Sequence, residues 1–247
     1  RTHHTLEHGM FMRRLDPAGD DPSARVLLWL HGLGESGLCF ERIIHHQDLA
    51  DARHVVPDLP GYGRSPWPAA PLTLPDMADL LARWLRDTGT RTPVVVGHSM
   101  GGVLGQLLVE RHPGAARALV DVDGNVSEGD CGFSKRVTGH SLAAFETKRY
   151  GKLCNAIYEQ GIDDRPLRGY YASLRLADPR AFYVNAQELV ELSVSETLGE
   201  RLAALQLPTV YIAGFPRGAA PRSLTLLRKA GVPLELVEPA GHWPFLD

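Results

Sequence analysis

The chain has no long apolar run, few cysteines and little excess charge of either sign. Its longest apolar runs, such as Val26–Leu30, are far shorter than the roughly 20 residues that a membrane-spanning helix needs. The 26 Lys and Arg residues are nearly balanced by 29 Asp and Glu residues, and they are scattered along the chain. This pattern argues against a nucleic-acid-binding or membrane-surface role. We therefore expect no nucleic-acid partner and no membrane span.

The three cysteines, Cys39, Cys131 and Cys154, follow no disulfide or metal-ligand spacing. No signal-peptide pattern opens the sequence, because Arg1, His3 and His4 do not make one. Unpaired thiols favour a reducing compartment, so the expected location is cytoplasmic. The sequence also carries no metal-ligand cluster and no dinucleotide fingerprint, so we expect neither a metal nor an organic cofactor.

What is present is the composition of an ordinary globular protein. Hydrophobic residues make up 44% and charged residues 22% of the 247-residue chain. A chain of this length buries a substantial core and fits one domain with an insertion better than two equal domains.

The most informative stretch is Gly97-His98-Ser99-Met100-Gly101-Gly102. A β-branched run, Val94–Val96, precedes it, and apolar residues at helical spacing follow it from residue 103. This predicts a strand, a sharp turn and a helix, with Ser99 at the apex. Side chains at positions 97 and 101 would collide with the adjoining strand or helix, which explains the glycines. A serine at a helix N-terminus is favourably placed for oxyanion chemistry, because free N–H groups point at it.

The remaining pattern alternates between strands and helices. The sequence predicts a hairpin or edge strand over 5–15, closed by a turn at 16–19, and helices over 40–50, 75–87, 103–111 and 221–230. Further strands are predicted over 25–30, 54–58, 94–97, 117–122, 208–214 and 233–237. Such alternation is typical of an α/β fold, with a mostly parallel, doubly wound sheet.

The alternation stops between residues 126 and 205. This stretch shows helical patterns over 139–160, 165–177, 179–192 and 194–205, and no convincing strand. We interpret 126–205 as a helical cap inserted into an α/β core formed by 1–125 and 206–247.

Four loops fall at the carboxyl ends of predicted parallel strands, where open α/β sheets build their sites. Their sequences are His31-Gly32-Leu33-Gly34, Asp58-x-x-Gly61-x-Gly63-x-Ser65, Gly97-His98-Ser99-Met100-Gly101-Gly102 and Gly241-His242. In this order and approximate spacing, the four motifs resemble the α/β-hydrolase family over essentially the whole chain. The most similar members are serine-nucleophile, esterase- or lipase-like enzymes with a helical cap.

The resemblance implies a role for each matching residue. Ser99 would be the nucleophile and His242 the base that takes its proton and returns it to the leaving group. The backbone N–H groups of Leu33 and Met100 would form the oxyanion hole. His31 and His98 would orient loops by hydrogen bonding. Related epoxide hydrolases and dehalogenases carry Asp where this chain has Ser99, so those activities are disfavoured.

The acid of the triad departs from the common family pattern. Most relatives place an Asp after the seventh strand, but no acidic residue occurs between Glu200 and Glu235. A minority use the end of the sixth strand, where this chain has Asp121 and Asp123. Strand alternation places both on the same side, and Asp123 is at the tip, so we expect Asp123 to be the acid. Alternatively, Asp123 caps the turn that follows it.

Other candidates are weaker. Asp58 and Ser65 match a structural turn of the family, whereas Glu35 lies beside the oxyanion loop and is a candidate for substrate contact. Aromatic residues of the predicted cap either line an apolar pocket or pack the cap on the core, and packing is the better interpretation for most of them: Phe133, Phe145, Tyr150, Tyr158, Tyr170, Tyr171, Phe182 and Tyr183.

Three functions remain open from the sequence. The first is hydrolysis of an ester, or an activated acyl bond, of a small to medium apolar substrate. The second uses the same serine and histidine for carbon–carbon bond hydrolysis, cofactor-free lyase chemistry or acyl-transfer cyclisation. The third is a hydrolase-like ligand-binding protein, against which the intact Ser99 and His242 count.

Overall fold

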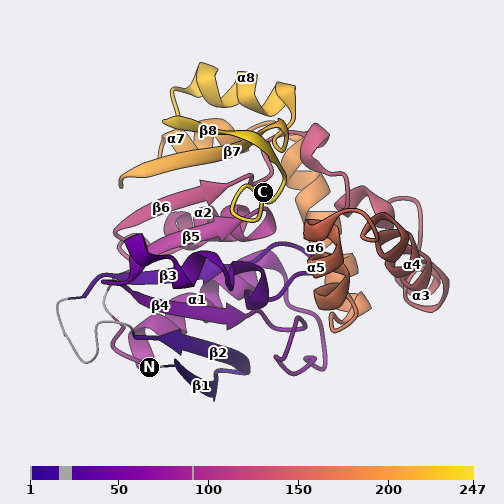
Figure 1. Cartoon of the computed structure of the whole chain (residues 1–247), viewed down its shortest axis with the longest axis horizontal. Coiled ribbons are helices and arrows are strands. Elements are labelled where there is room, and N and C mark those ends of the chain that lie inside the picture. Colours follow the sequence, from indigo (N-terminus) through magenta and orange to yellow (C-terminus); the bar gives the residue numbers. More distant parts are fainter. Residues whose placement is uncertain (1, 17–23, 91) are drawn as a thin grey trace.

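The described part of the chain, residues 2–16, 24–90 and 92–247 of a computed structural model, contains one eight-stranded sheet. The strand order is β1-β2-β4-β3-β5-β6-β7-β8 (Figure 1). The pairs β1–β2 and β2–β4 are antiparallel, and all other neighbouring strands are parallel. The strand bounds are β1 Thr2–Glu7, β2 Met10–Leu15, β3 Val26–Leu30, β4 Arg53–Asp58, β5 Val94–His98, β6 Ala118–Val122, β7 Thr209–Arg217 and β8 Leu234–Gly241. The predicted hairpin and the mostly parallel α/β sheet are confirmed, whereas most of the turn predicted at 16–19 lies outside the described residues.

The central strands have apolar side chains on both faces because both faces are covered. In β3, Leu28 and Leu30 belong to the large core cluster under the helices, while Trp29 between them belongs to a second cluster on the opposite face. In β5, Val95 and Val96 divide in the same way. This two-sided burial produces the continuous apolar runs that predicted parallel strands.

Two long helices pack together on the larger core. Helix α1 (Leu74–Asp87) begins at a capping box, in which Thr73 and Asp76 satisfy each other's backbone N–H groups. Helix α2 (Met100–Arg111) follows β5 and buries nearly all of its residues. Helix α8 (Pro221–Ala230) contributes Leu224 and Leu227 to the same core.

The helix predicted over 40–50 is wrong. Three short 3₁₀ helices occupy this region, η1 (Gly37–Phe40), η2 (Ile43–His45) and η3 (Gln47–Leu49). The backbone of His46 is extended, and its ring accepts a hydrogen bond from the Asp48 amide at 3.4 Å, so the helical path is interrupted there. Phe40 and Ile44 nevertheless bury their side chains in the second core cluster, which accounts for the helix-like spacing of apolar residues.

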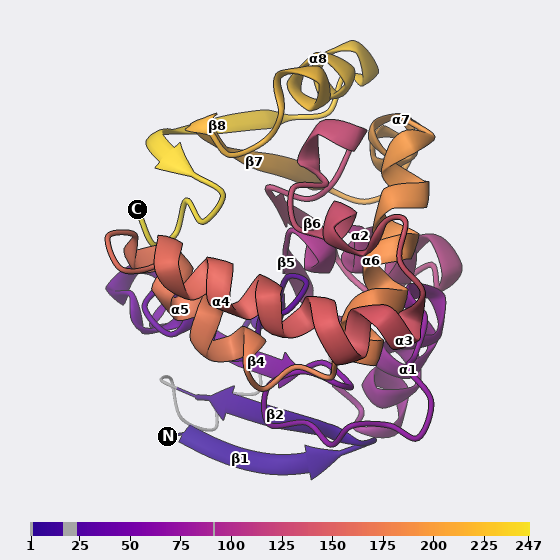
Figure 2. The same cartoon turned by 90° about the vertical axis from the view of Figure 1, so that its right-hand side faces the viewer.

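Residues 126–205 contain helices and no strand. The elements are η4 (Glu128–Asp130), η5 (Ser134–Val137), α3 (Leu142–Ala144), the π-helical η6 (Phe145–Arg149), α4 (Tyr150–Gln160), α5 (Arg165–Leu174), α6 (Pro179–Val194) and α7 (Leu198–Ala203). Figure 2 shows α3, α4 and α5 lying across one end of the sheet. Helix α7 instead contacts α2, since the Leu198 carbonyl accepts from Gln106 at 3.3 Å and Arg201 pairs with Glu110. The division into core and cap stays a prediction.

No helix in the described residues is both long and apolar enough to cross a membrane. All three cysteines are free thiols. No group of three or more His, Cys, Asp or Glu side chains in the described ranges is arranged to hold a metal ion. The cytoplasmic location and the absence of a metal remain predictions.

Candidate active site

Ser99 lies on a strained turn between β5 and α2. Its backbone has φ +53° and ψ −120°, a conformation that non-glycine residues rarely adopt. The flanking glycines leave room for this turn, because a Cβ atom on Gly97 would lie 2.1 Å from the Gly101 carbonyl oxygen. A Cβ atom on Gly101 would lie 1.9 Å from the Leu30 carbonyl oxygen. The predicted strand–turn–helix is therefore confirmed, together with the steric reason for both glycines.

The loop after β3 lies next to Ser99 because the order of successive strands in the sheet reverses at β3. Strand β3 has β4 on one side and β5 on the other, and Leu30 is in register with Gly97. The connections from these strands diverge, which opens a crevice at their carboxyl ends. A Cβ atom on Gly32 would lie 3.1 Å from the Ser99 Cβ atom, so the loop carrying Leu33 borders the serine.

The structure brings Asp123 and His242 together. His242 Nδ1 donates to Asp123 Oδ2 at 3.2 Å, and the Asp123 carboxylate is buried. The other carboxylate oxygen accepts from the amides of Gly214 and Ala219, at 3.0 and 3.1 Å. Gly214 in β7 and Ala219 in the loop after it, a region that carries no acid, thus supply two donors that fix the orientation of Asp123. The alternative, in which Asp123 caps the turn that follows it, has no matching hydrogen bond among these contacts.

Asp121 and Asp123 point in different directions, so the expectation that both lie on the same side is wrong. Asp123 has φ +50° and has left the extended conformation on which strand alternation depends. Asp121 accepts instead from the Gly124 amide at 3.0 Å and lies against Gly102. Burial raises the pKa of the Asp121 carboxyl to about 8.

Hydrogen bonds engage both carboxylate oxygens of Glu35, and its contact with substrate stays a prediction. Oε2 accepts from the Gly32 amide at 2.6 Å and from His98 Nδ1 at 2.9 Å, while Oε1 accepts from Trp243 Nε1. His98 Nε2 donates to the His242 carbonyl at 2.7 Å. This cluster of Glu35, His98 and Trp243 links the loop after β3, the strand before Ser99 and the loop that carries His242.

Electrostatics favour an ion pair within this cluster. Burial raises the pKa of Glu35, but the charge and hydrogen bonds of His98, with those of Trp243 and Gly32, outweigh burial and lower it to about 2. Burial lowers the pKa of His98, but Glu35 outweighs it, so the net shift is upward. Both ring nitrogens of His98 face acceptors, which is the arrangement of an imidazolium.

His31 and Asp58 hold neighbouring loops. His31 Nδ1 donates to the Gly32 carbonyl and Nε2 accepts from the Leu59 amide, each at 2.9 Å, and burial lowers the pKa of this histidine. Asp58 accepts from the amides of Gly37 and Arg64, both at 2.8 Å. Ser65 Oγ donates to the Asp58 carbonyl. These contacts are structural and join the loops that surround the site.

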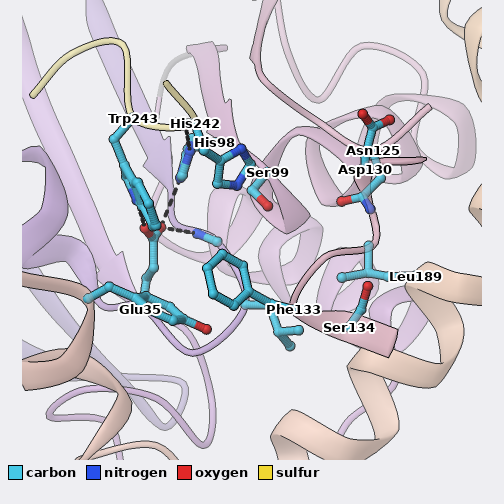
Figure 3. A pocket seen from close by; sticks show the side chains of 13 residues that line it. Glu35, His98, Ser99, Asn125, Asp130, Phe133, Ser134, Leu189, His242 and Trp243 are labelled. Atoms are coloured by element: carbon cyan, nitrogen blue, oxygen red, sulfur yellow. Dashed lines mark hydrogen bonds and ion pairs between the residues drawn. The ribbon is translucent and has the colours of Figure 1, made fainter. Parts of the chain in front are cut away.

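A small cavity contains both Ser99 and His242 (Figure 3). Its volume is about 20 Å³, close to the space that one water molecule occupies. The walls come from the core loops and from residues 125–189, and the lining residues are Gly32, Leu33, Glu35, His98, Ser99, Asn125, Asp130, Phe133, Ser134, Tyr170, Leu189, His242 and Trp243. Asn125 and Ser134 were not recognised as lining residues from the sequence, and only the position of Asn125 beside Asp123 points to it.

Five aromatic residues of 126–205 form two groups. Phe145, Tyr150 and Phe182 are buried and pack on one another, with ring centroids 5.7–5.8 Å apart. Phe133 and Tyr170 line the cavity and contact each other at 4.9 Å. The prediction that most of these rings serve packing is confirmed for the first group.

Comparison with known proteins finds similar sequences and folds. The chain is 26% identical over 232 residues to the pimeloyl-[acyl-carrier protein] methyl ester esterase of Proteus mirabilis, covering 90% of this chain and 87% of that protein. It is 40% identical over 114 residues to the lipase LipV of Mycobacterium tuberculosis, a match that spans only 46% of this chain and 41% of LipV. A solved structure described as a putative aryl esterase from Burkholderia cenocepacia has a TM-score of 0.74 at 20% identity, covering 100% of this chain and 93% of that one.

The fold, the strained serine turn and the order of the loops agree with a family match. The family model described as "Alpha/beta hydrolase family" matches residues 27–247, which is most of the chain. The match includes the serine turn at Ser99, Asp123 and His242. The chain therefore belongs to the α/β-hydrolase family.

Proposed function

We propose that this protein is a serine hydrolase that cleaves a carboxylic ester through an acyl-enzyme on Ser99. The observation that carries the proposal is the meeting of three features in one place. Ser99 is held on a strained turn, His242 lines the same cavity, and Asp123 accepts the Nδ1 proton of His242 at 3.2 Å. The names of the esterase and lipase relatives support the same reaction.

In the first step, Ser99 Oγ attacks the ester carbonyl carbon while His242 Nε2 takes the hydroxyl proton. The imidazolium that forms is stabilised by Asp123, which also fixes the tautomer that leaves Nε2 free to accept. The Gly214 and Ala219 amides hold the Asp123 carboxylate in place. His242 then gives its proton to the alcohol as the carbon–oxygen bond breaks.

The negative oxygen of the tetrahedral intermediate needs donors that are already in position. We assign this role to the backbone N–H groups of Leu33 and Met100. Met100 is the first residue of α2, so its N–H has no acceptor within the helix and points to the helix N-terminus. One donor of this kind typically contributes about 3–4 kcal/mol to transition-state stabilisation.

Water completes the cycle by attacking the acyl-enzyme carbonyl carbon while His242 takes a proton from the water. The bond between the acyl carbon and Ser99 Oγ then breaks, His242 returns the proton to Oγ, and the carboxylic acid leaves. A cavity of about 20 Å³ holds about one water molecule, which is less than any ester occupies, so the side chains that line it must move when substrate binds. We propose that the substrate is a small molecule with a short acyl group, since a shorter group requires a smaller movement of these side chains. Residues 126–205 form the cap in this proposal, since Phe133, Ser134, Tyr170 and Leu189 close the cavity over Ser99.

Hydrolysis of p-nitrophenyl esters from acetate to dodecanoate tests the proposal, together with labelling by a fluorophosphonate probe and mass spectrometry. We expect the highest kcat/KM at two to four acyl carbons and a label on Ser99. Ser99→Ala should remove both labelling and turnover. Ser195→Ala is the control, because Ser195 is exposed and hydrogen-bonds only within its own helix end and to Thr197.

Two results would contradict the proposal in different ways. Labelling of Ser99 without turnover of any ester, but with cleavage of a diketone or cyanohydrin, would move the protein to carbon–carbon bond hydrolysis or lyase chemistry. Absence of both labelling and turnover would favour a hydrolase-like ligand-binding protein.

A further inference from the structure

One polar group in the cavity wall has no hydrogen-bond partner. Tyr170 lies on α5, its side chain is only 4% exposed, and its hydroxyl is the one buried hydroxyl without a partner among the described residues. Leaving a buried polar group unpaired costs folding free energy, so such groups are rare in folded proteins and call for a specific explanation. Burial raises the pKa of Tyr170 well above its usual value, so the hydroxyl keeps its proton and can donate.

The hydroxyl is held beside the loop that carries the expected oxyanion hole. A Cβ atom on Gly34, the residue after Leu33, would lie 2.8 Å from Tyr170 Oη and 2.8 Å from Leu174 Cδ1. Helix α5 is fixed in this position by two hydrogen bonds, Ser36 to Ser173 at 3.0 Å and Tyr150 to the Leu174 carbonyl. The Tyr170 side chain therefore has a defined place in the wall of the cavity.

Tyr170 and His242 share two aromatic neighbours in the cavity wall. Phe133 contacts both rings, with centroids 4.9 Å from Tyr170 and 6.5 Å from His242. Trp243 also contacts both rings, with centroids 5.7 Å from Tyr170 and 5.1 Å from His242. His242 must reach the leaving oxygen, whereas Tyr170 Oη lies against Gly34 in the loop after β3.

We propose that the acyl chain of the substrate lies toward Tyr170, and that Tyr170 is a specificity-determining residue whose hydroxyl donates to an oxygen atom on that chain. The substrate class is esters of short alkoxy-, hydroxy- or oxo-acids, rather than of plain alkanoic acids. This inference rests on the proposed ester hydrolysis. It explains why an unpaired donor is retained in the cavity wall, since bound substrate supplies the missing acceptor.

The test compares two esters of matched shape, p-nitrophenyl methoxyacetate and p-nitrophenyl butanoate, on the wild type and on Tyr170→Phe. The ratio of the two losses cancels the intrinsic reactivity of each ester. We expect Tyr170→Phe to lower kcat/KM at least about 10-fold on methoxyacetate and less than about 3-fold on butanoate, because one neutral hydrogen bond is lost. The melting temperature should stay the same or rise, since an unpaired hydroxyl is removed. Tyr171→Phe, the same change on the next residue and outside the cavity wall, should alter neither ester.

Each other outcome has a definite meaning. Equal losses on both esters, or no loss on either, would overturn the assignment of Tyr170 while leaving ester hydrolysis in place. A lower melting temperature with unchanged selectivity would show that Tyr170 serves packing only. Failure of the wild type to cleave either ester would overturn the proposed function and this inference with it.

Discussion

Replacing Glu35 with Gln removes a buried charge while keeping the shape of the side chain. Glu35 and His98 are both nearly fully buried, and their charged atoms are 2.9 Å apart. At an effective dielectric constant of about 20, two unit charges at this distance attract by about 6 kcal/mol. Loss of one partner of a buried pair typically costs about 3–5 kcal/mol, because the remaining charge is left without compensation. A glutamine has a single acceptor oxygen, so at least one donor among Gly32, His98 and Trp243 also loses its acceptor.

We expect Glu35→Gln to lower the free energy of unfolding by about 3–5 kcal/mol in urea denaturation. For a chain of this size the melting temperature should fall by roughly 6–20 °C. Glu128→Gln is the matched control, because Glu128 pairs with Lys135 at the same 2.9 Å but both side chains are largely exposed. That variant should lose at most about 1 kcal/mol. Equal, small losses in the two variants would refute the claim that Glu35 and His98 form a buried ion pair.

The pH dependence gives a second check on the same pair. The pKa of Glu35 falls from 4.5 to about 2 on folding, so its stabilising contribution is present above pH 4.5 and disappears as the pH falls toward 2. The pKa of His98 rises above 6.5 on folding, so its contribution is present below pH 6.5 and disappears as the pH rises through the folded value. The stability difference between wild type and Glu35→Gln should therefore be largest between about pH 4.5 and 6.5. A difference that keeps growing above that window would contradict the assignment.

Two further predictions concern the turn and the second aspartate. Gly101→Ala should give no folded protein by circular dichroism, because its Cβ atom would lie 1.9 Å from the Leu30 carbonyl oxygen. Gly151→Ala is the control: its Cβ atom would have no neighbour within 4 Å, so this variant should be more stable than the wild type by about 0.5–1 kcal/mol. A soluble, cooperative Gly101→Ala protein would contradict the packing described for the turn. Asp121→Asn should gain stability relative to the wild type as the pH rises from about 4 to about 8, because folding raises the pKa of Asp121 from 3.8 to about 8 and the wild type loses stability over that range. If the urea midpoints of Asp121→Asn and the wild type differ by the same amount at every pH between about 4 and 8, the Asp121 carboxyl does not have a raised pKa.

Much of the site could be predicted because its geometry follows from local sequence. The glycines around Ser99 are required by close contacts that involve residues near the turn, so the local sequence predicts the turn. The apolar runs predict strands that are buried on both faces of the sheet. The role of Asp123 was predicted from a resemblance, yet its orientation was not. Asp123 has a positive φ, and the amides that bind it come from β7 and the loop after β7, so the periodicity of β6 does not describe its orientation.

The contacts of Glu35 and the path of residues 37–49 were not predictable for different reasons. Glu35 binds His98 and Trp243, which lie 63 and 208 residues away, so no local pattern identifies these partners. Between Gly37 and Leu49, the apolar spacing reports burial of Phe40 and Ile44 correctly. Their burial does not require a continuous α-helix, because short 3₁₀ helices separated by the extended His46 satisfy the same contacts.

The rate of fluorophosphonate labelling of Asp123→Asn tests most directly whether Asp123 acts through His242 on Ser99. Asparagine retains the size of the side chain but favours the wrong tautomer of the histidine, and such a change typically costs about 10⁴-fold. Asp121→Asn is the matched control, two residues away on the same segment and outside the relay. We expect labelling of Ser99 to slow by about 10³- to 10⁴-fold in Asp123→Asn and by less than about 3-fold in Asp121→Asn. Equal labelling rates in the two variants would contradict the relay and leave Ser99 and His242 without their acid.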